Sequence, residues 1–320
     1  MHIPLELVQI IIEYSLYSKN ASNHELAVSI KPDWKAIQPL TLASKTYRAL
    51  ALEAWFQTLF INSPNDLENL RELFPGIARS IRVLHCVQND ARYISMWDLT
   101  GLNHLSKIRL DWLSRRMMPH YRSKDPADRL PFTHIPSFVT ELDIRGLPWP
   151  SPMVFHNIES ILPNLKILRL RQQRIWCGLC HTCSVARFKE PGPERIIYEG
   201  GGGLPIHYAR ALRSLQHLRT VSITIADFGS GKMTVGQGDE HNRYLWSGEC
   251  DRCMEIMYDD DDFRDRYVAR KKGVANGDIG HAYVPPPGLN RVEWHFWRAE
   301  GSEEVDVQES EDEMSDSGEE

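Results

Sequence analysis

A short apolar pattern occurs six times after residue 75 and constrains the fold more than any other feature of this sequence. An apolar residue is followed by two others, a second apolar residue, one other, and a third apolar residue. The last two apolar positions alternate as the inward face of a β-strand does, and the first closes the turn that precedes the strand. Each of these six triplets therefore predicts one strand with one buried face. The six triplets are Ile81-Leu84-Cys86, Leu105-Ile108-Leu110, Val139-Leu142-Ile144, Leu165-Leu168-Leu170, Leu218-Val221-Ile223 and Leu289-Val292-Trp294.

The spacing of the six triplets indicates a repeat with two long insertions. Their first positions are 24, 34, 26, 53 and 71 residues apart. A repeat of about 25 residues leaves roughly thirty and forty-five extra residues in the last two intervals, which predicts insertions at about 171–211 and 226–286. The pattern resembles degenerate leucine-rich repeats of an irregular subclass that lacks the usual ladder of Asn residues. The resemblance implies one parallel strand per repeat in a curved sheet, and the alternative is a generic α/β domain.

The first sixty residues carry a helical pattern instead. Pro4 suits the first turn of a helix, because a backbone N–H at that position has no hydrogen-bond partner within the helix. Leu5, Val8, Ile11 and Ile12 follow at helical spacing. So small a bundle closes only a small core, and a partner surface would complete it. A second helical run comprises Leu40, Ala43, Tyr47, Leu50, Ala51, Ala54 and Trp55.

These helical segments resemble the F-box, the module by which substrate receptors dock onto SCF-type cullin–RING ubiquitin ligases. The resemblance rests on the segments 3–7, 10–12 and 40–48, and it implies binding to the SCF adaptor subunit and, through it, to cullin. The segment Ser18–Pro32 is longer than the usual connection in this family. The alternative is an ordinary helical cap on a larger domain. The resemblance assigns adaptor contacts to Pro4, Leu5, Ile10, Ile11, Leu40, Leu42 and Ser44.

The charge of the chain is distributed unevenly. The formal net charge is −6, but residues 300–320 contain eleven acidic residues and no Lys or Arg, which leaves the rest of the chain at +5. An acidic tail without aromatic residues is expected to be disordered. Arg169 and Arg171 lie on a predicted strand with their side chains outward, where an acidic partner can meet them. The small basic excess and the lack of a binding motif argue against nucleic acid as the partner.

The chain is expected in the cytoplasm or the nucleus. No apolar run reaches the eighteen or so residues that a membrane span needs, so no membrane contact is predicted. The first segment carries Glu6 and Glu13 and no basic leader, which argues against a signal peptide. In a reducing compartment, six cysteines indicate metal binding or buried thiols rather than disulfides.

Four cysteines form two CxxC pairs, one in each predicted insertion. Cys177 and Cys180 form the first pair, and Cys250 and Cys253 form the second, with 69 residues between the pairs. Two such pairs complete a tetrahedral zinc site. Insertions after consecutive parallel strands leave the same edge of a sheet, so the two pairs are expected to meet. The sequence therefore predicts a structural Zn²⁺ site of four thiolates.

Three alternatives remain at these cysteines. Cys183 can replace Cys180, because Cys180 and Cys183 are also spaced as CxxC, and His181 is a reserve ligand. The thiols can also be unliganded loop residues. A catalytic zinc site would keep a position for water beside a Glu or His; Glu249 is adjacent to the second pair, but four thiolates favour a closed, structural site.

No enzymatic motif is present. The run Gly200–Gly203 is not followed by Lys-Ser/Thr and does not form a G-x-G-x-x-G fingerprint, which makes it a flexible connector. Neither G-x-S-x-G nor HExxH occurs in the chain. The expected chemistry is therefore a choice of partner rather than a reaction.

Taken together, these patterns predict an α/β chain in three parts. Residues 1–62 form an F-box-like helical module, 63–299 a degenerate leucine-rich-repeat solenoid whose two insertions are joined by a metal site of four cysteines, and 300–320 a disordered acidic tail. An F-box followed by irregular repeats is similar to a group of fungal F-box-like proteins. The resemblance implies a substrate-recognition adaptor of an SCF-type ligase, with an unknown protein substrate on the repeats. The alternative is a zinc-stabilised interaction scaffold outside any ligase, and an enzyme is the least favoured reading.

Overall fold

Most of the chain between residues 4 and 297 is described by the structure, a computed structural model. The predicted acidic tail, most of the second insertion and His181 lie outside the described residues. The described residues are 4–17, 25–31, 33–89, 96–113, 130–147, 152–155, 158–177, 179–180, 183–184, 195–226, 248–250, 253, 256, 259–271 and 284–297.

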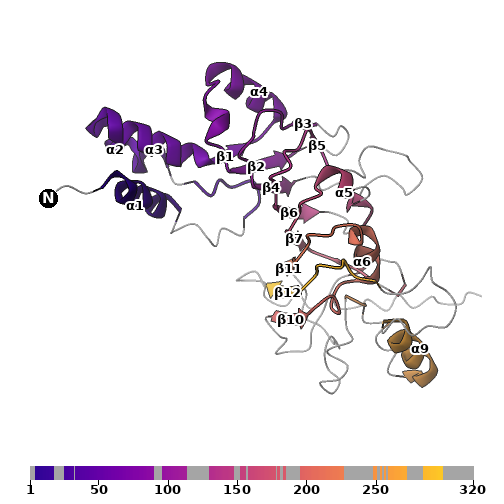
Figure 1. Ribbon diagram of the computed structural model, residues 1–320. Coiled ribbons are helices and arrows are strands. Elements are labelled where there is room, and N and C mark those ends of the chain that lie inside the picture. The colour runs from indigo at the N-terminus through magenta and orange to yellow at the C-terminus, as the bar shows by residue number, and fades with distance from the viewer. Residues whose placement is uncertain are drawn as a thin grey trace, which may run out of the picture.

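An eight-stranded, mostly parallel sheet forms the centre of this mixed α/β structure (Figure 1). Its strand order is β1-β2-β4-β6-β7-β11-β12-β10, and all neighbours are parallel except β12 and β10. The strands are β1 Thr58–Ile61, β2 Val83–Gln88, β4 Lys107–Trp112, β6 Glu141–Leu147, β7 Ile167–Gln172, β11 Thr220–Ala226, β12 Arg291–Trp297 and β10 Arg195–Glu199.

Each of the six triplets marks one strand of this sheet. The last two residues of each triplet lie on β2, β4, β6, β7, β11 or β12, and the side chains of all six triplets are buried in one continuous core. Because side chains of a strand alternate between its faces, this burial leaves the intervening residues on the opposite face. The strands predicted from the triplets are therefore confirmed.

The turns that precede the strands are joined by a repeated hydrogen bond. The N–H of each turn donates to the carbonyl of the preceding turn at 2.8 to 2.9 Å. This series satisfies backbone groups that would otherwise be buried without partners, and it stacks each turn on the last. The donor–acceptor pairs are Ser106 to Arg82, Thr140 to Ser106, Lys166 to Thr140, Arg219 to Lys166 and Asn290 to Arg219.

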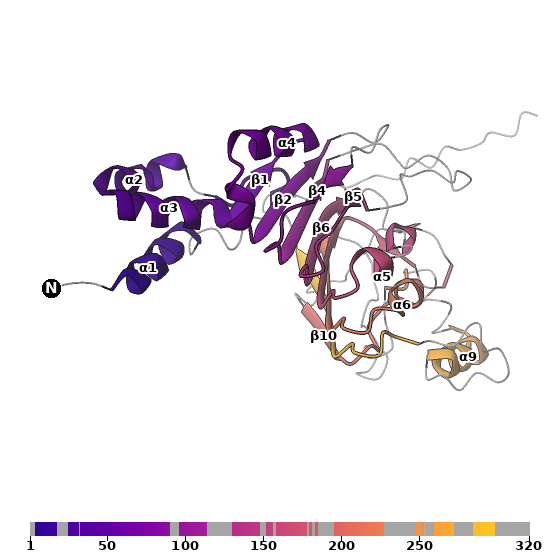
Figure 2. The same ribbon diagram turned by 45° about the horizontal axis from the view of Figure 1, so that its top comes forward.

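Helices cover the triplet face of the sheet (Figure 2). They are α4 Pro64–Leu73, α5 Ile158–Ile161 and α6 Ile206–Leu212, with the short 3-10 helices η2 Ile77–Arg79 and η4 Pro152–Phe155. Phe155 and Tyr208 pack with their ring centroids 5.8 Å apart, which joins η4 to α6 over the core. This layer supplies the apolar surface that the triplets need.

Both edge strands of the sheet lie outside the triplet pattern. β1 falls within residues 1–62, so the sheet begins inside the segment assigned to the helical module. β10 comes from the first insertion and pairs antiparallel with β12. It lies at the end of the sheet, after β11 and β12, although it precedes both of these strands in the chain. Ile196 and Tyr198 of β10 are buried between more exposed neighbours. The insertion is therefore partly built into the sheet rather than forming a loop alone.

The N-terminal helices form a module with a small core of its own at the β1 end of the sheet (Figure 1). The helices are α1 Leu5–Tyr17, η1 Trp34–Ala36, α2 Gln38–Ala43 and α3 Lys45–Gln57, which leads directly into β1. The Ser44 side chain accepts a hydrogen bond from the N–H of Tyr47 and caps α3. The buried residues of this second core are Val8, Ile12, Leu16, Ile37 and Ala54.

The remaining elements are two short pairs of strands and the helix α9. The two-stranded pairs are β3 Trp97–Asp98 with β5 Phe132–Thr133, and β8 Ile175–Trp176 with β9 Cys183–Ser184. The helix α9 Asp261–Lys271 begins after Asp260, whose carboxylate accepts from the N–H of Phe263. Among the described residues, no helix combines the length and the apolar character that a membrane crossing requires.

Candidate functional sites

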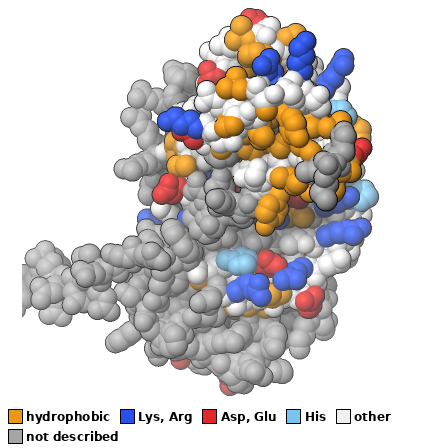
Figure 3. Space-filling view, turned by 90° about the vertical axis from the view of Figure 1, so that its left-hand side faces the viewer, with side chains coloured by type: hydrophobic (Ala, Val, Ile, Leu, Met, Phe, Trp, Pro, Cys, Tyr) orange, Lys and Arg blue, Asp and Glu red, His pale blue; other side chains and the backbone are white. Residues whose placement is uncertain are grey.

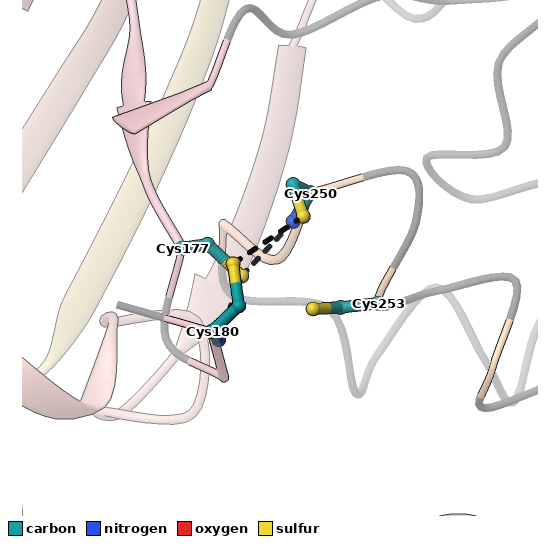
Figure 4. A group of neighbouring side chains, drawn as sticks. All are labelled: Cys177, Cys180, Cys250 and Cys253. Atoms are coloured by element: carbon teal, nitrogen blue, oxygen red, sulfur yellow. Dashed lines mark hydrogen bonds between the residues drawn. The ribbon is translucent and has the colours of Figure 1, made fainter. Parts of the chain in front are cut away.

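The two CxxC pairs meet in the structure. Cys177 follows β8, and Cys180 lies three residues on; Cys250 and Cys253 come from the second insertion, just after Gly248, whose φ is +91°. The four sulfur atoms lie within 4.8 Å of one another, and Figure 4 shows their side chains converging from two separate segments. The predicted meeting of the two insertions is confirmed, and this four-cysteine cluster can hold a metal ion.

The geometry of the cluster suits a small tetrahedral ion. A tetrahedron with metal–sulfur bonds of roughly 2.3 Å has edges of roughly 3.8 Å. The sulfurs of Cys180 and Cys250 are 3.8 Å apart, which equals such an edge. Three of the four cysteines are buried and only Cys180 is exposed, so the donor set is closed by protein on most sides.

Backbone N–H groups converge on the sulfur of Cys177. The N–H groups of Leu179, Cys180 and Cys250 donate to it at 3.4, 3.5 and 3.3 Å. Donors directed at a sulfur stabilise its thiolate form, the form that ligates metals. One of these donors comes from the second insertion, so the backbone itself joins the two segments.

The thiols shift one another's protonation. A hydrogen bond from the Cys177 thiol lowers the pKa of Cys250 to about 4, and the same bond, with burial, raises the pKa of Cys177. Burial and the neighbouring Cys250 raise the pKa of Cys253 to about 12. Within the cluster, these effects make Cys250 easier to ionise than Cys177 or Cys253. A cation among the four sulfurs would favour their thiolate forms, and its binding would release protons.

The cluster is packed against the main core. Trp176, Cys177, Cys250 and Cys253 all belong to the core that contains the six triplets. The adjacent Glu249 is buried, and its carboxylate accepts a hydrogen bond from the hydroxyl of Tyr267 on α9. The second insertion is thus fixed at the cluster and through α9, in keeping with a structural role for these cysteines.

The other cysteines and the reserve ligand are placed as follows. Cys183 lies in β9, where its backbone pairs with Trp176, and His181 lies outside the described residues. Cys86 is buried on β2, and its thiol donates to the carbonyl of Arg109 at 3.3 Å. Burial raises the pKa of Cys86, which makes it an inert core residue as the sequence predicts.

A second candidate site is an apolar surface on the helical module. The view in Figure 3 shows hydrophobic side chains gathered on this side of the molecule. Their exposed fractions lie between 48% and 73%, which is high for apolar residues of one small module. We call this surface the exposed apolar face; it comprises Leu5, Leu7, Ile10, Ile11 and Tyr14 of α1, and Leu42 of α2.

The residues assigned to adaptor contacts divide into two groups. Pro4, Leu5, Ile10, Ile11, Leu42 and Ser44 are exposed. Leu40 is partly buried against the core of the module, and the exposed Ser44 also caps α3.

Two residues of the exposed apolar face were missed in the sequence. Leu7 and Tyr14 are half or more exposed, at positions that the helical spacing of the buried residues does not include. The sequence of α1, LELVQIIIEYSLY, does indicate them, because it contains more apolar residues than one buried helix face can hold.

Charged residues line the face of the sheet opposite the triplets. We call this the polar face; Arg169 and Arg171 lie on it as predicted from the strand alternation. Arg169 forms an ion pair with Glu141 of the neighbouring strand at 2.8 Å. Burial and the nearby Arg145 lower the pKa of Arg171. Its described charged residues on the central strands include His85, Arg109, Asp111, Asp143, Arg145, Arg169, Arg171, Glu293 and His295.

Comparison with known proteins identifies no relative. No protein-family model, no curated protein and no solved structure matches this chain.

Proposed function

We propose that this chain is a substrate-recognition subunit of an SCF-type cullin–RING ubiquitin ligase. The N-terminal module docks onto the SCF adaptor subunit, and the sheet domain, taken as an irregular leucine-rich-repeat solenoid, binds the protein to be ubiquitylated. The other subunits carry out ubiquitin transfer, so this chain contributes proximity and selection.

The exposed apolar face is the observation that carries the proposal. Six large apolar side chains on α1 and α2 stay exposed although the module has a core of its own. Large apolar side chains that stay exposed on one small module are typical of a protein–protein interface. Leu5, Ile10, Ile11 and Leu42, which the F-box resemblance assigns to the adaptor, are part of it. The sequential order of the strands and their stacked turns support the repeat interpretation of the sheet domain.

The adaptor contact is tested with a double substitution in α1. We expect Pro4→Ala with Leu5→Ala to weaken binding to the purified SCF adaptor subunit by about 30-fold or more, as removal of central interface residues does. Binding is measured by isothermal titration calorimetry. Both residues are exposed, so the thermal midpoint of unfolding should stay within about 2 °C of that of the wild type.

A matched control uses exposed apolar residues elsewhere in the chain. Leu73→Ala and Phe138→Ala remove side chains that are as exposed as those of α1 but lie on other elements. Both variants should bind the adaptor as the wild type does. If the Pro4–Leu5 double variant also binds undiminished, the ligase proposal is wrong, and the alternative of an interaction scaffold takes its place.

The ion proposed for the four-cysteine cluster is Zn²⁺ in a structural role. Thiolate ligands in tetrahedral arrangement favour zinc, and four protein ligands leave no position for a reacting water. Cys177, Cys180, Cys250 and Cys253 would hold the ion, which would supply the link between the two insertions. The contacts of Glu249 with α9 then extend that link to the rest of the second insertion.

Metal analysis of the purified protein tests the zinc proposal. Freshly purified protein should contain about one zinc per chain, measured by inductively coupled plasma mass spectrometry. Ser substitutions at each of the four cysteines should lower this content, whereas Cys86→Ser, which changes a buried thiol outside the cluster, should not. A metal-free wild-type protein, or full zinc content in the Cys250→Ser variant, would contradict the assignment.

A further inference from the structure

The segment between α1 and α2 crosses onto the polar face of the sheet. Glu25, Leu26 and Ala27 lie against β4 and β6 of the sheet. The chain then returns to the helical module, where the Lys31 ammonium lies 4.5 Å from the centroid of the Trp55 ring. A direct connection between two packed helices does not need this path.

Three consecutive residues of the segment each meet a complementary group on the sheet. The carbonyl of Glu25 accepts a hydrogen bond from Arg109 Nη2 at 3.0 Å. The N–H of Ala27 donates to Asp111 Oδ2 at 2.8 Å. Between them, a methyl carbon of Leu26 packs over Gly146. A Cβ atom added to Gly146 would lie only 2.8 Å from this methyl carbon. The contacts use backbone polar groups on both sides of one apolar side chain.

The sheet residues that make these contacts form a built site. Arg109 donates two hydrogen bonds to the carboxylate of Asp111, each at 2.8 Å, and His85 shares a third at 2.7 Å. All three side chains are buried. Burial would raise the pKa of Asp111, but hydrogen bonds from His85 and Arg109 hold it well below its usual range, so the carboxylate remains an anionic acceptor. The donor and the acceptor are thus held by contacts within the sheet as well as by the segment.

Two residues at the site, Ala27 and Gly146, have positive φ angles. Ala27 has a φ of 56°, a left-handed region that is unfavourable for a residue with a Cβ atom. Gly146 has a φ of +73° and lies where the register between β6 and β7 shifts. The strain at Ala27 is maintained by its bond to Asp111, and the missing side chain of Gly146 makes room for Leu26.

We propose that Arg109, Asp111 and Gly146 form a peptide-binding site that the chain's own Glu25–Ala27 segment occupies. The ligand class is a short peptide with an apolar residue between a backbone carbonyl acceptor and a backbone N–H donor. Arg109 and Asp111 bind the backbone of the peptide by hydrogen bonds. The space above Gly146 accommodates its apolar side chain. The proposal goes beyond the proposed function and does not depend on adaptor docking.

The tether explains why the site is occupied by the chain itself. A segment joined to the protein by a few residues on each side has an effective concentration in the millimolar range. A free peptide of the same sequence therefore binds only after the segment has been released. A partner peptide of the same class would compete with the segment and free the connection between α1 and α2.

The first experiment releases the segment in the full chain. Ala27→Pro removes the N–H donor to Asp111 and cannot adopt a φ of 56°. Hydrogen–deuterium exchange of residues 25–31, followed by mass spectrometry, should become at least about tenfold faster than in the wild type. Ala27→Gly is the matched control, because it keeps the N–H and relieves the strain, and it should leave exchange unchanged or slower. Equal protection in the Ala27→Pro variant would overturn the proposal.

The second experiment supplies the peptide separately. A fluorescein-labelled peptide of residues 23–30 is titrated with each protein, and binding is measured by fluorescence anisotropy. The peptide should bind the Ala27→Pro variant at least about tenfold more tightly than it binds the wild type, whose site is occupied. Leu26→Lys in the full chain provides a second released protein in case the proline variant unfolds, which circular dichroism reports.

Two altered peptides separate recognition from nonspecific adhesion. Proline in place of Ala27 removes the N–H, and lysine in place of Leu26 removes the apolar side chain, while the protein itself stays unchanged. Each altered peptide should bind the released protein at least about tenfold more weakly than the native peptide. If all three peptides bind alike, or if the native peptide binds neither released protein, no peptide-binding site exists at Arg109 and Asp111. The residues of the exposed apolar face are untouched in both experiments, so their outcome is independent of the adaptor test.

Discussion

At the scale of single residues, His85 shows how the polar face differs from an ordinary charged surface. Its ring is buried, with Phe60 4.7 Å away in an edge-on arrangement and Asp111 on its Nε2 side. Its Nδ1 atom has no hydrogen-bond partner among the described residues. Burial lowers the pKa of His85, and this effect exceeds the opposing attraction of Asp111. The neutral ring is therefore the form that the fold stabilises.

This shift predicts a loss of stability in mild acid. The pKa of His85 is lower in the folded chain than the ordinary value of about 6.5, so the unfolded chain binds more protons between these two pKa values. The free energy of unfolding should fall as the pH drops below about 6.5, and the loss should be complete below the folded pKa. His85→Gln keeps a donor toward Asp111 but does not titrate, so its urea unfolding should depend less steeply on pH between 7 and 5. Parallel pH profiles for the two proteins would contradict the prediction.

The residues of the candidate sites were predictable to different degrees. The four cysteines could be read from CxxC spacing alone, because two ligands from one turn need that spacing whatever the fold. The contact of Ala27 with Asp111 could not, since it depends on a left-handed backbone conformation that nothing in the local sequence demands. Buried charges such as Arg109 and His85 were also missed, because a charged residue on a strand is ordinarily expected in solvent.

At the scale of secondary-structure elements, the shift between β6 and β7 is sensitive to a single methyl group. A Cβ atom at Gly146 would lie 2.4 Å from the carbonyl oxygen of Trp112 on β4, and a backbone atom cannot move aside. Its φ of +73° adds the cost of the left-handed region. The register shift at this point of β6 therefore depends on glycine for two separate reasons.

Three glycine-to-alanine variants separate these reasons. Gly146→Ala should destabilise the chain by about 3 kcal/mol, from the clash and the backbone cost together. Gly101 has a φ of +81° but no neighbour within 4 Å, so Gly101→Ala should cost about 1 kcal/mol. Gly76 has neither feature, and Gly76→Ala should change stability by about 0.5 kcal/mol or less. Urea unfolding gives the three values; a Gly146 variant no less stable than the Gly101 variant would refute the steric argument.

The strands show which elements a sequence reveals. Each triplet combines a turn and a strand within a few residues, so a local pattern suffices to find β2, β4, β6, β7, β11 and β12. β10 has alternating burial as well, but it lies in a predicted insertion, and its pairing with β12 joins segments far apart in the chain. Only the assembled sheet decides that this segment becomes an edge strand.

At the scale of the whole molecule, the described residues form two separate apolar cores. One lies between the sheet and its helices and includes the four-cysteine cluster, and the other lies within the N-terminal module. α9 lies at the opposite end of the molecule from α1 and α2 (Figure 1), and the Glu249–Tyr267 hydrogen bond joins α9 to the segment of Cys250. Loss of order at one end therefore does not require loss of order at the other.

Removal of the ion should act on one end of the molecule only. With zinc proposed at the cluster, a strong chelator should speed hydrogen–deuterium exchange around β8 and in α9, because the ion would link the two insertions that carry these segments. Exchange in α1 and α3 should stay the same, which makes the N-terminal module an internal control. Uniform acceleration along the chain would show instead that the cluster stabilises the fold as a single cooperative unit.

The position of β10 has a consequence for the order in which the protein is made. During synthesis, β1, β2, β4, β6, β7 and β11 can pair one after another, since each neighbour has already left the ribosome. β10 emerges before β11 but must wait for β12, its only neighbour in the sheet, which ends at Trp297. Until then its apolar residues Ile196 and Tyr198 have no strand to join, and the nascent chain carries an unpaired segment of the kind that chaperones bind. The last strand of the sheet to be synthesised thus fills the position between β11 and β10, and it brings the waiting edge strand into the sheet.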